Sequence, residues 1–114
     1  MKKRPIVFIM HINLEIEKIE KNTKDISKSL FSRDENLKDA TIRRIEIIGE
    51  AIRNLPKEFK DKYPFVEWKA IVGMRDKLIH QYFGVDIDKV WEVVKKEIPD
   101  LKEKINQILK ELEK

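Results

Sequence analysis

The recurrence of apolar residues every three or four positions is the feature that most constrains how this chain can fold. A period near 3.6 residues gathers such residues on one side of an α-helix. A short example runs from Leu101 to Leu112, and a longer one occupies residues 35–55. One face of that longer segment carries Leu37, Thr41, Ile45, Ile48, Ile52 and Leu55. Few glycines and prolines, 3 and 4 respectively, and a charged fraction of 40% are also typical of amphipathic helices. The pattern therefore predicts an all-α protein.

Residues that begin or end helices divide the chain into four or five expected helices. Ser32, followed by Glu35 three residues later, indicates a capping box that opens the long helix. Gly84 is the expected end of the next helix, Asp86 caps a fourth, and Pro99 begins a fifth. The expected spans are about 9–21, a short piece at 24–31, then 35–55, 66–82, 86–96 and 99 onward, with a connection at 56–62. We therefore expect one domain over residues 1–114, folded as an up-and-down bundle of four to five helices.

The composition excludes several kinds of site and partner. No cysteine is present, which rules out disulfides, thiolate metal ligands and cysteine nucleophiles. The net charge of +4, from 25 basic and 21 acidic residues, permits an anionic partner without requiring one. The apolar run at residues 6–10 is too short for a signal peptide, and no stretch approaches the ~20 apolar residues of a membrane span. We therefore expect a cytoplasmic protein without a membrane partner.

Arg75 lies in the middle of the apolar stripe of the helix expected at 66–82. A guanidinium cannot lose its proton in a protein, so burying it without a partner is costly. It must reach a carboxylate, a carbonyl, a cleft or a ligand. A structural ion pair, or an arginine that extends its charged end to solvent, is the plainer alternative. The other members of the stripe are Trp68, Ile71, Val72, Leu78, Ile79 and Tyr82.

His80 is the second residue of interest on this helix. It lies about 140° around an ideal helix from Arg75, so the two converge on a ligand only if the long arginine side chain bends round, the last turn is distorted, or two subunits meet there. Asp76 precedes His80 by four residues on the same side, where its carboxylate could fix the imidazole tautomer and favour the imidazolium. A lone histidine near a helix end is often structural. One aspartate and one histidine make a poor zinc site, and no glycine-rich phosphate loop is present, so we expect neither a metal nor a cofactor.

Residues 68–91 closely resemble the HepT-like branch of the HEPN superfamily. These small all-α proteins carry an Arg-x4-His-x-Tyr motif, which is present here as Arg75, His80 and Tyr82. The resemblance extends to residues 48–51, 63–64 and 98–101, and it covers roughly residues 10–110. The bare Arg-x4-His spacing is a weak signal, whereas the whole set is specific.

The resemblance implies a homodimer whose Arg75 and His80 line a cleft at or near the subunit interface. It implies a metal-independent ribonuclease that acts as a toxin. The expected partner is a minimal nucleotidyltransferase antitoxin, which can attach AMP to the motif tyrosine, here Tyr82. The residue after the arginine is commonly asparagine in relatives. Here it is Asp76, which adds a negative charge beside the expected phosphate site.

Three functions are therefore weighed. The first is RNA cleavage, in which Arg75 binds phosphate and His80 moves a proton. The second is a non-catalytic nucleotide- or RNA-binding subunit of a nucleotidyltransferase complex, which the charge of Asp76 slightly favours. The third is a plain structural bundle in which Arg75 pairs with an acid of the long helix.

Overall fold

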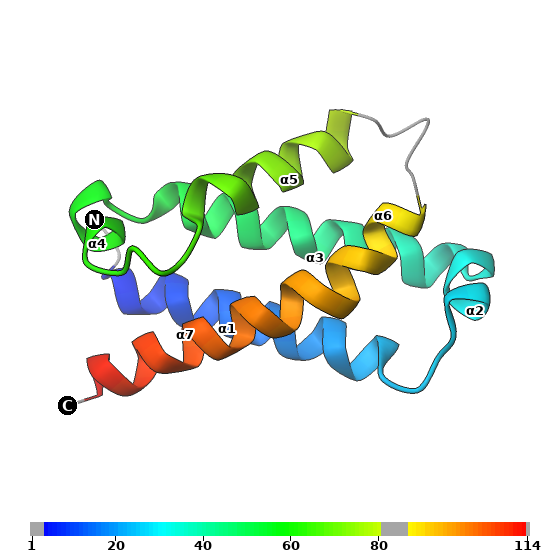
Figure 1. Ribbon diagram of the computed structural model, residues 1–114, viewed down its shortest axis with the longest axis horizontal. Helices are drawn as coiled ribbons and strands as arrows, with labels where there is room; N and C mark the ends of the chain where they lie inside the picture. The colour runs from blue at the N-terminus through cyan, green and yellow to red at the C-terminus, as the bar shows by residue number, and fades with distance from the viewer. Residues whose placement is uncertain (1–3, 81–86, 114) are drawn as a thin grey trace.

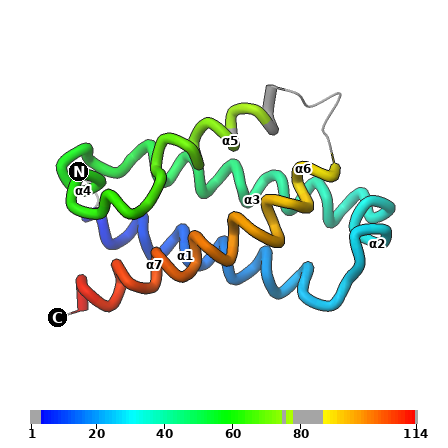
Figure 2. The backbone as a smooth tube through the Cα atoms, viewed as in Figure 1, coloured from blue at the N-terminus to red at the C-terminus, as the bar shows by residue number. Residues whose placement is uncertain are grey.

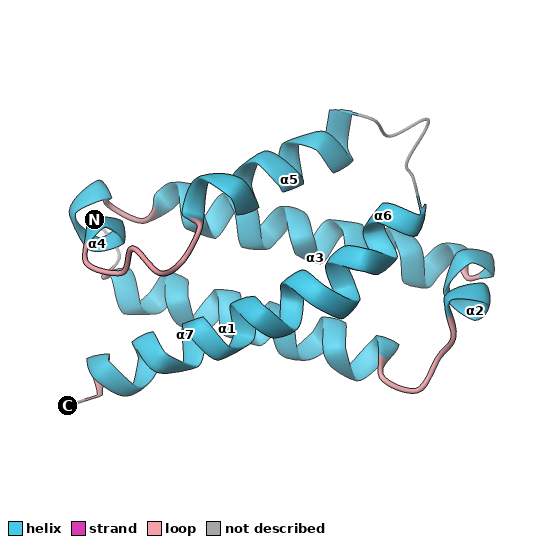
Figure 3. Ribbon diagram, viewed as in Figure 1, coloured by secondary structure: helices cyan, strands magenta, loops and turns pink. Residues whose placement is uncertain are grey.

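All of the secondary structure in the described part of the chain is helical, which confirms the predicted all-α class (Figure 3). The computed structural model describes residues 4–80 and 87–113, apart from the side chains of residue 75 and residues 78–80. The helices are α1 (Pro5–Thr23), α2 (Lys28–Arg33), α3 (Glu35–Asn54), α4 (Lys57–Asp61), α5 (Trp68–His80), α6 (Ile87–Glu92), the π-helical segment η2 (Val93–Glu97) and α7 (Ile98–Leu112).

The long helical stretches lie alongside one another and alternate in direction, as an up-and-down bundle requires (Figures 1 and 2). Helix α1 packs against α3 and α7, and α3 packs against α5. The short α2 lies between α1 and α3 in sequence and contacts α3 and α6. Helix α5 begins beside α4, at the end of the bundle where α1 also begins. From there α5 runs away from that end of the bundle (Figure 1).

Several predicted helix boundaries are wrong in an informative way. Helix α1 begins at Pro5 rather than near Ile9, and proline is well tolerated in a first helical turn. The cap of α3 is Asp34, whose carboxylate accepts a hydrogen bond from the Leu37 N–H at 3.0 Å. The Ser32 hydroxyl instead donates to the Ser29 carbonyl at 2.9 Å, so the predicted capping box is not formed.

Two further predictions fail because local signals were read as breaks. The polar run after Pro56 was expected to be a connection, yet it forms the short helix α4. Pro99 was expected to open a new helix, but α6, η2 and α7 follow one another without a break. The wider π-helical turn ends directly before Ile98 and Pro99. Such a turn accommodates the ring and the missing N–H of a proline without ending the helix. The predicted stop at Gly84 and the cap at Asp86 lie outside the described residues.

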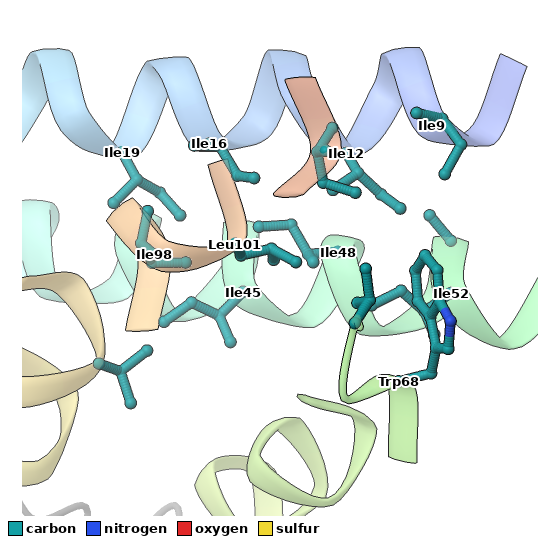
Figure 4. Close-up of a cluster of buried hydrophobic side chains, with 14 of the residues drawn as sticks. Ile9, Ile12, Ile16, Ile19, Ile45, Ile48, Ile52, Trp68, Ile98 and Leu101 are labelled. Atoms are coloured by element: carbon teal, nitrogen blue, oxygen red, sulfur yellow. The ribbon is translucent and has the colours of Figure 1, made fainter. Parts of the chain in front are cut away.

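The core follows the predicted apolar faces. Figure 4 shows isoleucines of α1 pointing toward those of α3 and α7, with Trp68 of α5 at one end. The long face of α3 is buried from Thr41 to Leu55, while Leu37 is half-buried. No helix among the described residues is long and apolar enough to cross a membrane.

The packing predicts that substitutions at buried positions lower the free energy of unfolding more than substitutions at exposed positions do. Ile48, 1% exposed, lies at the centre of this core. Replacing it with alanine should lower the free energy of unfolding by about 3 kcal/mol, since apolar contacts are lost and a cavity remains. Leu14 on α1 is 44% exposed, and Leu14→Ala should change the free energy of unfolding by no more than ~0.5 kcal/mol. Urea unfolding at one fixed protein concentration measures both, and equal losses would contradict this core.

Candidate functional site

The candidate site is carried by α5, the helix that contains the segment singled out from the sequence. The structure places the backbones of Arg75, Asp76 and His80 on this one helix. Tyr82 lies outside the described residues, as do the side chains of Arg75 and His80. The roles predicted for these three residues therefore stay predictions, and Asp76 is the candidate whose side chain the structure places.

The start of α5 is fixed by Trp68. Its side chain is buried, and its indole N–H donates to the carbonyls of Lys60 and Tyr63 at 3.1 and 3.2 Å. The Tyr63 ring in turn packs against Phe59 of α4, with ring centroids 5.0 Å apart. Burial is also the main reason that the pKa of Tyr63 is raised. These contacts hold the beginning of α5 against α4 and the residues that connect the two helices. The sequence alone did not reveal that Trp68 positions α5 in this way.

Asp76 forms an ion pair with Arg53 in the last turn of α3. The Nη2 of Arg53 donates to both carboxylate oxygens of Asp76, at 2.9 and 2.7 Å. The Arg53 side chain is 51% exposed and that of Asp76 31%, so the pair lies at the surface where α3 and α5 run side by side. Sequence reasoning missed Arg53. The pairing depends on the register of two helices that are distant in sequence, and no local spacing reveals it.

The ion pair changes the electrostatics expected around Asp76. From the sequence, this residue adds a negative charge beside the expected phosphate site. In the structure, a guanidinium lies directly on that carboxylate and offsets its charge. The negative charge of Asp76 is therefore a weaker obstacle to phosphate binding than the sequence indicates.

A cleft of about 810 Å³ lies on another side of α5, between this helix and the α6–α7 stretch, over α3. Gly73 lines the cleft, and a Cβ atom at that position would meet nothing within 4 Å. Lys104 at its rim is engaged by Asp100, 2.9 Å away, and this hydrogen bond raises the pKa of the lysine. The cleft also includes Ile45, Ile48, Met74, Lys77, Ile98 and Leu101. Its volume is within the range of ligand sites, and sequence reasoning did not find it because it forms between helices.

A comparison with protein families gives one match that spans most of the chain. The model described as "Ribonuclease HepT-like" matches residues 12–108. This range contains α5 and α3 entirely, and with them Arg53, Asp76 and the backbone positions of Arg75 and His80.

The names of curated relatives also contain the words RNase or ribonuclease. A protein of Caldanaerobacter subterraneus subsp. tengcongensis is 49% identical over 107 residues, which cover 94% of this chain and 96% of the relative. The "Probable ribonuclease HepT" of Thermococcus cleftensis is 43% identical over 110 residues, 96% of this chain and 100% of the relative. A Methanocaldococcus jannaschii protein is 54% identical over all 114 residues, but the chain spans only 51% of that relative's length. Its name is "Gamma-glutamylcyclotransferase and putative RNase", and that of the Caldanaerobacter protein also contains the words "putative RNase". No solved structure matches the chain.

Proposed function

This chain belongs to the HepT-like ribonuclease family, and we propose that it is a metal-independent endoribonuclease that acts as the toxin of a toxin–antitoxin system. The observation that carries the proposal is the family match over residues 12–108, within which the Arg-x4-His spacing falls on the single helix α5. The net charge of +4 is compatible with an RNA substrate.

The proposed reaction is attack of a ribose 2′-hydroxyl on the adjacent phosphorus. The bond from O2′ to phosphorus forms and the bond from phosphorus to O5′ breaks, giving a 2′,3′-cyclic phosphate and a free 5′-hydroxyl. Arg75 stabilises the charge that develops on the phosphate oxygens, because its planar fork can donate to two of them. His80 transfers a proton near neutral pH, either from the 2′-hydroxyl or to the leaving oxygen.

A homodimer follows from the number of histidines. The reaction needs both a proton acceptor and a proton donor, and the other histidine of the chain, His11, lies on an exposed part of α1. Two copies of His80, one from each subunit, would supply both roles. The offset of about 140° between Arg75 and His80 also favours a site that two subunits complete. We therefore propose that the active protein is a homodimer. We also propose that it acts in the cytoplasm, as expected from the sequence.

The experiment that tests the proposed function is RNA cleavage in the presence of EDTA. The purified wild-type chain should cut a mixed-sequence RNA, and Arg75→Ala and His80→Ala should each lose most of this activity. Undiminished cleavage by both variants would contradict the assignment of the site. The magnitudes of the two losses are considered in the Discussion.

A non-catalytic subunit that binds RNA or nucleotides remains the competing function. Its support from the sequence was the negative charge of Asp76, and Arg53 offsets this charge in the structure. RNA binding by the wild type without any cleaved product would favour this competing function.

The proposed antitoxin is a minimal nucleotidyltransferase that transfers AMP to Tyr82. On an ideal helix continued beyond His80, Tyr82 would fall about 20° from Arg75, two turns later. The added phosphate would then lie close to the arginine and compete with RNA phosphate. After co-expression with such an enzyme, the chain should gain the mass of one AMP group, and Tyr82→Phe should abolish most of the gain. A Tyr82→Phe chain modified to the same extent would exclude Tyr82 as the main acceptor, and Tyr63→Phe is the matched control.

A further inference from the structure

We propose that Arg53 is a second phosphate-binding residue of the RNA site, held in place for this role by Asp76. This inference rests on the proposed function in one respect, namely that RNA binds along the face of α5 that carries Asp76 and His80. It assigns a role to a residue outside the Arg-x4-His-x-Tyr motif and on a different helix.

The hydrogen bonds of Arg53 leave part of its guanidinium available. Both bonds to Asp76 use the same nitrogen, Nη2, at 2.9 and 2.7 Å. Within the described part of the chain, Nη1 and Nε of Arg53 have no hydrogen-bond partner. A guanidinium presents five N–H donors in a fixed plane, so the N–H groups of Nε and Nη1 can each still donate to a phosphate oxygen. The side chain is 51% exposed, which leaves these N–H groups accessible.

The position of Arg53 relative to the motif is set by Asp76. This aspartate directly follows Arg75, and His80 lies four residues, or ~6 Å of helix rise, further along α5. On the helix wheel Asp76 and His80 are only about 40° apart. A guanidinium bound to Asp76 therefore lies about one turn from the backbone of His80. This distance suits the phosphate next to the scissile one rather than the scissile phosphate itself.

The carboxylate restricts a long, flexible side chain to one position. An arginine loses considerable rotamer freedom when it binds a ligand, and a partner that already orders it reduces this cost. The Arg53–Asp76 ion pair is nearly neutral as a whole. A bound phosphate therefore adds negative charge to this site, and Arg75 and the overall charge of +4 can balance it. Asp76 thus orders Arg53, and Arg53 offsets part of the negative charge of Asp76.

The test measures binding of a fluorescent 2′-O-methyl oligonucleotide, which has no 2′-hydroxyl to attack and so separates binding from cleavage. Arg53→Gln should weaken binding about tenfold, the size of one charge-assisted contact. It should also make the dependence of log Kd on log salt shallower by about 0.7, the value for one phosphate of a single strand. Arg43 of α3, 59% exposed and paired with Glu46, offers a matched control. Arg43→Gln removes the same charge and should change Kd by no more than about twofold.

Two further variants separate a phosphate contact from a purely structural ion pair. Arg53→Lys can keep the ion pair with Asp76 and hence the thermal stability, but it lacks the separate N–H donors of Nε and Nη1, so less than half of the lost binding free energy should return. Adding Asp76→Asn to Arg53→Gln removes the negative charge that Arg53 no longer offsets, and the double variant should bind more tightly than Arg53→Gln but more weakly than wild type. With cleavable RNA, Arg53→Gln should raise KM and leave kcat nearly unchanged.

The outcomes distinguish this inference from the proposed function. If Arg53→Gln binds the oligonucleotide as Arg43→Gln does, the inference is wrong, whether or not the wild type cleaves RNA. If the wild type binds through Arg53 but cleaves no RNA, the inference holds and the proposed catalysis fails. Full recovery of binding in Arg53→Lys would also overturn the inference, because one point charge would then suffice.

Discussion

Replacing His80 with alanine is expected to lower the rate of RNA cleavage by about 10²–10⁴-fold, the usual contribution of a general acid or base. In the proposed mechanism, loss of the imidazole means that the 2′-hydroxyl keeps its proton during attack, or that the O5′ oxygen leaves without receiving one. The rate should be measured in single-turnover experiments with an excess of protein, so that product release does not hide the chemical step. Binding of the 2′-O-methyl oligonucleotide should change much less than the rate.

The chain provides its own control for this variant. His11 is the other histidine, and it is exposed on α1. His11→Ala removes the same chemical group and should leave the rate within about twofold of wild type, as expected for a surface substitution. Equal losses in His11→Ala and His80→Ala would show that a general effect, and not proton transfer by His80, is responsible.

Replacing Arg75 with alanine is the second large effect, with an expected loss of about 10²–10³-fold in kcat. In the proposed mechanism the arginine donates to phosphate oxygens whose charge increases in the transition state, so its removal should affect kcat more than KM. Arg75→Lys keeps the positive charge but not the planar fork, and it should recover only part of the rate.

Arg75→Ala also distinguishes the catalytic interpretation from a purely structural one. If Arg75 only pairs with an acid of α3, replacing it should mainly lower the free energy of unfolding. If Arg75 is catalytic, replacing it should lower kcat at temperatures well below the midpoint of unfolding. A variant that keeps kcat but unfolds at much lower temperature would therefore support the structural bundle.

The sequence predicted the fold well where the signal is periodic. The faces of α1, α3 and α7 repeat every three or four residues over many turns, and nearly every predicted core position is buried. Single-residue signals were less reliable, because their effect depends on the surrounding structure. Pro99 does not break the helix, since η2 adjusts the preceding turn, and Asp34 caps α3 in place of Ser32.

The site was predictable only along one helix. The wheel placed Asp76 and His80 on one side of the helix, and the structure confirms that this helix runs through His80. Contacts between helices could not be derived from a single sequence, because they depend on the register and rotation of packed elements. Arg53 beside Asp76 is one such contact, and Glu15, a buried acid that pairs with Arg44 at 3.3 Å, is another.

The central claim, metal-independent cleavage by the 2′-hydroxyl, is tested most directly by the chemical ends of the RNA products. We predict that the wild-type chain, in excess EDTA, yields fragments with a 2′,3′-cyclic phosphate and a 5′-hydroxyl, identified by mass spectrometry. An Arg75→Ala/His80→Ala chain purified in the same way should yield almost none, which excludes a contaminating nuclease. Fragments with a 3′-hydroxyl and a 5′-phosphate, or equal cleavage by the double variant, would contradict the proposed mechanism.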